Sequence, residues 1–244
     1  MRKADRGDDH QSAGDSRRPQ RLYTYHKAVK VPDIREEWDE SHNYRWYITL
    51  PLRRPGAELA VLMMNPSWTD PGRCDRTVWN VQTFVCNSPS LQDVGSITIV
   101  NLFAFRDVSS KALAGGRASG LVGAENDRWL EAVFRRAARV IIACGKVPGP
   151  QAGVMAYLDR MRAVRALLDQ CGQQARCVAE TRDGYPLHAR RWLEEQYRKS
   201  QMPQYSWAAC TKGTEQSGVS DGSVVDDSST GSDLSTRKRV SGGR

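Results

Sequence analysis

Apolar positions along the middle of the chain fall into blocks of strand and helix length. Short runs rich in β-branched and aromatic residues predict buried strands over residues 44–50, 58–64, 96–103 and 139–144, and a shorter one over 176–179. Helical spacing predicts helices over residues 75–86, 126–138, 151–170 and 186–198. Strands and helices therefore alternate along the chain.

This alternation predicts an α/β fold, a three-layer sandwich with a largely parallel central sheet. In such sheets ligands bind at the carboxyl ends of the strands. Polar residues follow several of the predicted strands. We therefore expect them to meet at one edge of the sheet.

The two ends of the chain differ from its middle. Residues 1–20 are polar and charged, which predicts a disordered arm, and residues 201–244 are rich in serine, glycine and aspartate, which predicts a disordered low-complexity tail. Residues 21–200 are left as a single α/β domain. No stretch approaches the roughly 20 apolar residues of a membrane span, and the amino-terminal residues lack a secretory apolar region. We expect a cytoplasmic protein without a membrane partner.

The charge of the chain is concentrated in its predicted domain. The net charge is +8, while residues 1–40 and 201–244 each carry equal numbers of basic and acidic residues. A basic domain favours a polyanionic partner, most often nucleic acid, although a basic soluble protein without such a partner has the same composition. Six cysteines without a CxxC pair, and only four histidines, indicate reduced thiols and no metal site or cofactor.

The sharpest candidate motif follows the second predicted strand, in the stretch AVLMMNPSWTD. Asn65 offers an acceptor and two donors to a water or a ligand, and Pro66 stiffens the turn. Ser67 and Asp70 are further candidate ligand contacts. The alternative is a turn that uses these side chains only for capping.

Polar residues also end the next two strands. Asn101, Phe103, Phe105 and Arg106 lie in the stretch NLFAFR, where an aromatic ring would stack on a base and the arginine would meet a phosphate. The alternative places the two rings in the core and the arginine in a salt bridge. Gly145 closes the strand over residues 139–144.

A fourth cluster, TRDGYPLH, contains Arg182, Asp183, Gly184 and His188. Asp183-Gly184 is a turn signal. A histidine just inside a helix that begins at Pro186 would donate to a developing negative charge or bind a phosphate, although a lone histidine is more often structural. Before the helix over residues 126–138, Asn126 or Asp127 is the expected N-cap.

The order of these motifs along the chain resembles that of the domain-of-unknown-function family 1643 of bacteria and phages. The family pattern reads YRY-x-L, LNPSxAD, DPT, NLFAYR, GxEND, a strand ending in WG, and TKDGxPxHP, and the resemblance covers roughly residues 43–193. This chain departs from the pattern at Trp68-Thr69, Arg76, Cys144 and Ala189. The last departure puts the shape of the loop around His188 in question. The family name itself implies no activity.

A more distant resemblance connects the strand ending in Asn65-Pro66 with the uracil-DNA glycosylase superfamily, in particular its mismatch-specific uracil and thymine branch. That branch reads GINPG at this place, where the asparagine positions the attacking water. A methionine stands here in place of the first glycine of that motif, and the Pro-Ser of the superfamily's late loop is absent.

The second resemblance implies a reaction and a set of roles. It implies N-glycosidic cleavage in DNA, with Asn65 orienting water and His188 bonding the base carbonyl. Phe103 or Phe105 would stack on the flipped base. The phosphates would be held by basic residues such as Arg106, Arg182, Arg190 and Arg191.

Two other functions remain open at this stage. A nucleic-acid-binding module without catalysis would use the same basic edge, and an enzyme acting on free nucleotides in a phage or plasmid DNA-modification pathway would need no DNA. No nucleophile elbow, Walker loop, GxGxxG or HExxH motif is present, which lowers the weight of those enzyme classes. The sequence leaves the oligomeric state and the substrate base open.

Overall fold

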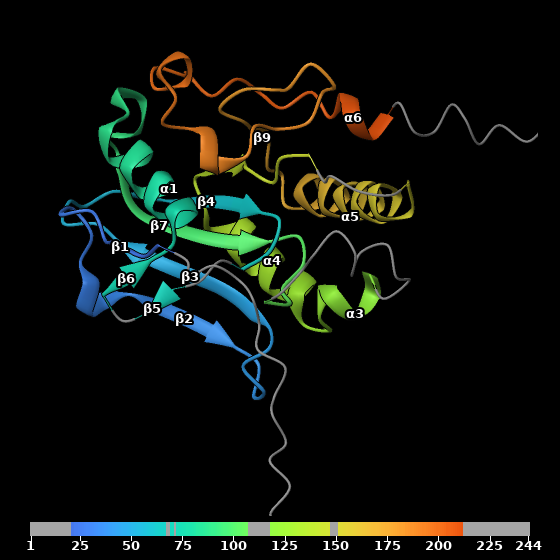
Figure 1. Ribbon diagram of the computed structural model, residues 1–244, viewed down its shortest axis with the longest axis horizontal. Helices are drawn as coiled ribbons and strands as arrows, with labels where there is room; N and C mark the ends of the chain where they lie inside the picture. The colour runs from blue at the N-terminus through green and yellow to red at the C-terminus, as the bar shows by residue number, and fades with distance from the viewer. Residues whose placement is uncertain (1–20, 67–68, 71, 107–117, 147–150, 212–244) are drawn as a thin grey trace, which may run out of the picture.

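The computed structural model describes residues 21–66, 69–70, 72–106, 118–146 and 151–211 (Figure 1). The predicted arm over residues 1–20, the greater part of the predicted tail, and Ser67 lie outside the described residues. The protein is a mixed α/β fold in which helices flank a six-stranded sheet.

The sheet joins an antiparallel edge to a parallel centre. Its spatial order is β2 (Arg35–Trp38), β3 (Arg45–Pro51), β7 (Val94–Asn101), β4 (Ala57–Met63), β8 (Arg139–Ile142) and β9 (Ala175–Arg176). The four strands from β7 to β9 pair in parallel, whereas the β2–β3 and β3–β7 pairings are antiparallel. The sheet is therefore mixed, because a short β2–β3 connection imposes antiparallel pairing that strand periodicity alone does not reveal.

Alternating side chains of the strands supply two hydrophobic cores, one on each face of the sheet. On β4, Leu59, Val61 and Met63 face the core that contains helix α1 (Arg76–Asn87), while Ala60 and Leu62 face the other core. That second core contains α4 (Asn126–Arg136) and α5 (Gln151–Gln170), with α3 (Ala118–Val122) beside them (Figure 1). The period of two in the strands thus assigns each residue to a face.

Short elements complete the fold. A small antiparallel sheet contains β1 (Tyr23–Thr24), β6 (Arg73–Cys74) and β5 (Thr69–Asp70). Two 3-10 turns lie earlier in the chain, η1 (Val31–Asp33) and η2 (Pro89–Leu91), and two lie later, η3 (Ala189–Arg191) and η4 (Glu195–Tyr197). The last helix is α6 (Ala208–Thr211).

The predicted helix over residues 186–198 is wrong. His188 and Glu194 both have extended backbone conformations, and each precedes one of the short turns η3 and η4. The ring of His188 accepts a hydrogen bond from the Arg190 amide, which satisfies that donor without a helix. Tertiary burial of Trp192 then holds the irregular segment against α1.

Residues 201–211 pack on the domain, beyond the boundary that we expected at residue 200. Met202, Tyr205, Trp207 and Cys210 are buried. The Tyr205 hydroxyl donates to the Gly184 carbonyl over 3.1 Å. The two aromatic rings, together with the smaller buried apolar residues of this segment, supply the apolar surface that holds it in place.

Candidate functional site

The parallel strands direct their carboxyl ends to one edge of the sheet. In chain order β4 comes first, β7 second, β8 third and β9 fourth, yet β4 lies between β7 and β8. The chain leaves β4 toward α1 on one face and leaves β8 toward α5 on the other. In open α/β sheets, ligands bind where neighbouring strands diverge in this way, which here is between the carboxyl ends of β4 and β8.

Three predicted residues lie at or just beyond the carboxyl ends of these strands: Asn101 is the last residue of β7, Asn65 follows β4 and Gly145 follows β8. Met63 pairs with Asn101 on β7, and Leu62 pairs with Ile142 on β8. Asn65 therefore lies two residues beyond the Met63–Asn101 pair, and Gly145 lies three residues beyond Ile142. Asn65 is half-buried, and its side-chain amide contacts the Pro66 carbonyl over 3.4 Å.

Gly145 and His188 are in direct contact. A Cβ atom placed on Gly145 would lie 2.7 Å from the His188 Cβ, and the backbone of Gly145 has φ +74°. Only glycine combines this conformation with such a close approach. The fold therefore seats the histidine directly on the end of β8, and we call Asn65, Asn101, Gly145 and His188 the carboxyl-edge site.

The local contacts of His188 determine which of its nitrogens carries the proton. Its Nδ1 accepts a hydrogen bond from the Arg190 amide over 3.0 Å. Burial, with a smaller contribution from Arg190, lowers the pKa of the ring below its usual range. A neutral ring with Nδ1 as acceptor carries its proton on Nε2. Nε2–H is thus the donor available to a ligand.

The loop before His188 is fastened to the end of β8. Lys146 forms an ion pair with Asp183 over 2.6 Å, and its ammonium lies 5.5 Å from the centre of the Tyr185 ring. The buried Tyr157 hydroxyl donates to the Gly145 carbonyl over 2.6 Å. Residues distant in the sequence are thereby fixed around the site, and the local pattern did not single out Lys146 or Tyr157.

Helix α1 holds the other side of His188. The buried side-chain amide of Asn80 donates to the Arg190 carbonyl over 2.6 Å and to the Ala189 carbonyl over 3.3 Å. Its Oδ1 is buried without a hydrogen-bond partner. An asparagine inside a helix has no distinctive sequence signal, so sequence reasoning missed this support.

Asn101 is fully buried at the end of β7, and both polar atoms of its side chain lack a hydrogen-bond partner. A buried amide in this state costs free energy unless a ligand or water completes it. The backbone around it is well supported, because the Asn126 amide donates to the carbonyls of Asn101 and Leu102, each over 3.1 Å. Asn101 thus holds an unpaired donor and an unpaired acceptor in a rigid, fully buried position.

The expected capping role of Asn126 or Asp127 is wrong. Glu125 occupies the N-cap position of α4, and its side chain makes no capping hydrogen bond. Asn126 instead reaches β7, and the Asp127 carboxylate accepts a 2.5 Å hydrogen bond from Arg160. The Arg160 Nε also donates to the Leu102 carbonyl. These long-range contacts replace local capping.

Arg45 is a buried charged residue that sequence reasoning took for an ordinary strand position. Its Nη1 contacts Glu36 over 3.2 Å and Thr69 over 2.7 Å, while Nε and Nη2 have no partner. Burial lowers its pKa, and the Glu36 carboxylate partly opposes that effect. The sequence signal for this role was an arginine placed among apolar residues of a strand. Through its hydrogen bond to Thr69, Arg45 supports the segment that follows Asn65.

The structure separates the residues of the NLFAFR stretch. Phe103 is fully buried in the core on the α4 face, so it cannot stack on a base, and the core alternative holds for this ring. Phe105 is half-buried and packs edge-on against Tyr44 at 5.3 Å. Arg106 lies 5.5 Å from the centre of the Trp38 ring.

The other predicted contacts are scattered around the same loops. Pro66 is buried, Arg182 and Asp183 are exposed, and Gly184 is buried with φ +82° against Ala208. Asp70 belongs to β5, and its side chain lies outside the described part of the structure. Among the described residues, Arg182 makes no hydrogen bond or ion pair with His188.

The described cysteines and acidic residues form no metal-binding group. All six cysteines are free, and no three histidine, cysteine, aspartate or glutamate side chains gather around one point within the described ranges. Burial raises the pKa of the Cys74 and Cys177 thiols to about 12. No helix among the described residues is long and apolar enough to cross a membrane.

Comparison with known proteins gives one match. The family model described as "Protein of unknown function (DUF1643)" matches residues 45–189, which is more than half of the chain. The matched region runs from the start of β3 to η3 and contains every residue of the carboxyl-edge site. No curated protein and no solved structure matches the chain significantly.

Proposed function

The chain belongs to the DUF1643 family, and we propose that it is an enzyme that hydrolyses the N-glycosidic bond of a nucleotide in DNA. One observation carries the proposal. A neutral His188, with Nε2–H available, lies on Gly145 beside the strand end that precedes Asn65. An amide that can orient water and a donor that can stabilise a departing base are the two groups that this reaction needs.

The proposed reaction breaks the bond between the sugar carbon and the base nitrogen. Water held by Asn65 forms the new carbon–oxygen bond, and the bonding electron pair leaves with the base. His188 Nε2–H donates a hydrogen bond to the base carbonyl as negative charge grows there, and the proton released by water neutralises the base. Because its pKa is lowered, the His188 ring is neutral and donates this hydrogen bond from Nε2–H without first taking up a proton.

Asn101 has no direct contact with the base in this proposal, because its side chain is as fully buried as that of Phe103. The exposed Arg182 and Arg190 lie on the loops around His188 and would contact phosphates. The likeness to uracil-DNA glycosylases agrees with these roles and rests on the sequence motifs.

The test is a cleavage panel with labelled single- and double-stranded oligonucleotides that carry uracil, mismatched thymine or hydroxymethyluracil. Alkali converts each abasic site into a strand break. We expect cleavage at one base, and a loss of at least 100-fold in Asn65→Ala and His188→Gln. Gln170→Ala, an exposed helix position, is the control. Cleavage unchanged in both site variants would contradict the proposal.

A nucleic-acid-binding module without catalysis is the second candidate. The concentration of the whole +8 charge in residues 41–200 favours it. It predicts salt-dependent binding of oligonucleotides with no abasic product in the same panel.

A further inference from the structure

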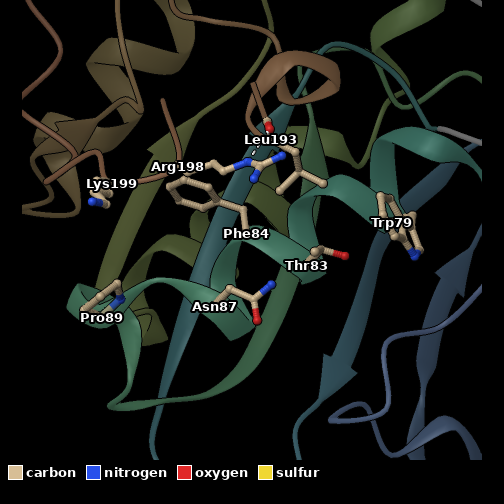
Figure 2. A pocket seen from close by; sticks show the side chains of 8 residues that line it. All are labelled: Trp79, Thr83, Phe84, Asn87, Pro89, Leu193, Arg198 and Lys199. Atoms are coloured by element: carbon tan, nitrogen blue, oxygen red, sulfur yellow. Dashed lines mark hydrogen bonds between the residues drawn. The ribbon is translucent and has the colours of Figure 1, made fainter. Parts of the chain in front are cut away.

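A groove runs between helix α1 and the segment that follows η3, away from the carboxyl-edge site. Its cavity volume is about 540 Å³. Figure 2 shows the side chains that line it, most of which come from these two segments, with Arg198 close to Leu193 and Phe84. The ones that matter here are Trp79, Thr83, Phe84, Leu193, Arg198 and Lys199. We call it the α1 groove.

The floor of the α1 groove is aromatic and rigidly held. Phe84 is buried, and its ring lies 5.1 Å from the Trp192 ring beneath it. Trp79 is half-buried and stacks on Tyr23 with ring centres 5.3 Å apart. Trp79 contacts Tyr23 and also lines the groove. The half-buried Trp79 ring is therefore the one suited to stacking on a flat ligand, while the buried Phe84 supports the floor from beneath.

The rim of the groove is positively charged. Arg198 donates from Nε to the Leu193 carbonyl over 2.7 Å, which holds its guanidinium over the groove (Figure 2). Lys199 is exposed. Neither cation forms an ion pair with a described residue, and none of the lining residues is acidic. The Thr83 hydroxyl is buried without a hydrogen-bond partner, so it is not counted among the polar groups of the rim.

We propose that the α1 groove binds one nucleotide unit of a single-stranded nucleic acid. The base would stack on the aromatic floor and its phosphate would meet Arg198 and Lys199. The cavity volume falls within the roughly 300–1,000 Å³ of small-ligand sites. An apolar floor with cations on its rim and no carboxylate is complementary to an aromatic ring that carries an anion.

The position of the groove also fits a strand that passes the carboxyl-edge site. Asn80 contacts the residues that follow His188, and Thr83 lies three residues further along the same helix. Three residues are less than one helical turn and span about 4.5 Å along the helix axis. One or two nucleotides of a strand cover that distance at about 3.4 Å each. The choice of a single-stranded nucleic acid as the ligand, rather than a free nucleotide, rests on the proposed function.

The experiment measures binding of a labelled oligothymidylate 12-mer and of thymidine monophosphate at several salt concentrations. The double variant Arg198→Gln/Lys199→Gln removes the rim charges. Lys27→Gln/Arg128→Gln removes two exposed cations elsewhere and serves as the charge-matched control. Trp79→Leu tests stacking, and thermal unfolding confirms that each variant is folded.

We expect the rim variant to bind the 12-mer roughly tenfold more weakly at low salt. Its slope of log K against log salt should fall by about 0.7, which corresponds to one lost phosphate contact. Trp79→Leu should weaken binding roughly tenfold without changing that slope. Weakened binding of the monophosphate by the same variants would show that a free nucleotide also uses the groove.

Two outcomes separate this inference from the proposed function. Binding in the rim variant that equals binding in the control variant would overturn the groove assignment, even if base release continues. Groove-dependent binding without any base release would uphold the groove and contradict the glycosidic reaction. No binding of either probe by the wild-type protein would overturn the groove assignment.

Discussion

The carboxyl-edge site and the α1 groove share helix α1 but differ in how their residues are held. At the edge, Tyr157, Asn126 and Asn80 each bind a backbone carbonyl from a distant part of the chain. In the groove, the hydrogen bond from Arg198 to Leu193 is local. Fixed geometry is what bond-breaking chemistry requires, whereas stacking and phosphate contacts tolerate small shifts. The difference predicts that changes at the edge cost more than changes at the groove.

The largest expected effect is that of Gly145→Ala. The new Cβ would lie 2.7 Å from the His188 Cβ, and the residue would also have to adopt φ +74°. We expect a loss of roughly 3 kcal/mol in the free energy of unfolding, measured in urea, together with loss of activity.

Gly172→Ala separates the two causes of that loss. Gly172 has φ +67°, but nothing lies within 4 Å of its added Cβ. We expect this variant to lose only about 1 kcal/mol. Equal losses in the two variants would show that the contact with His188 is unimportant.

The next largest effect is expected from Asn126→Asp, which tests how much the long-range hydrogen bonds at the end of β7 contribute to stability. The change replaces an amide donor by a carboxylate that faces two backbone carbonyls. We expect a loss of about 2 kcal/mol in the free energy of unfolding, because both carbonyls lose their partner. Gln174→Glu, the same chemical change at an exposed position, is the control. An equally small effect in both variants would show that the two hydrogen bonds from Asn126 contribute little to stability.

The pH dependence of stability tests the state of His188. Burial lowers its pKa in the folded protein, so the unfolded chain binds a proton more readily. The free energy of unfolding should therefore fall as the pH drops below about 6.5, the ordinary histidine value. His188→Gln should show a weaker fall between pH 7 and 5 in urea titrations. The pKa of His26 is lowered in both proteins, so its contribution cancels. Identical pH profiles would refute a neutral, buried ring.

The smallest effect is expected from Lys146→Ala. The ammonium and the Asp183 carboxylate are both more than half exposed, at 53% and 57%. Exposed ion pairs contribute little because solvent screens them. We expect a barely measurable change in thermal unfolding, and salt should reduce it further. A large loss would mean that this pair, rather than Gly145, holds the loop before His188.

Sequence periodicity predicted most of the regular elements. The structure has strands over Ala57–Met63 and Val94–Asn101 and a helix over Asn126–Arg136, close to the expected ranges. Each contains enough apolar residues at one period to define its buried face. The failures lie where long-range contacts override local pattern, as in the irregular segment after His188 and the buried residues beyond 200.

The roles of the predicted site residues stay a prediction, although the sequence singled out two residues that meet in the structure. Polar residues that follow buried strands are visible in the sequence, and the contact between Gly145 and His188 joins two of those clusters. Arg45 and Asn80 were not recognised, because a strand arginine and a helical asparagine acquire meaning only from what surrounds them. Phe103 was one of two rings expected to stack on a base, with the core as the alternative, and it lies beyond the end of β7, buried in the core on the α4 face.

By itself the sequence determined the buried strands, the main helices and the strand ends that carry polar residues, because these depend on periodicity between neighbours in the chain. Only the tertiary structure decided the mixed direction of the sheet, the partners of each backbone carbonyl and the seat of His188 on Gly145. Those features depend on residues that are distant in the chain and meet only after the two cores have formed.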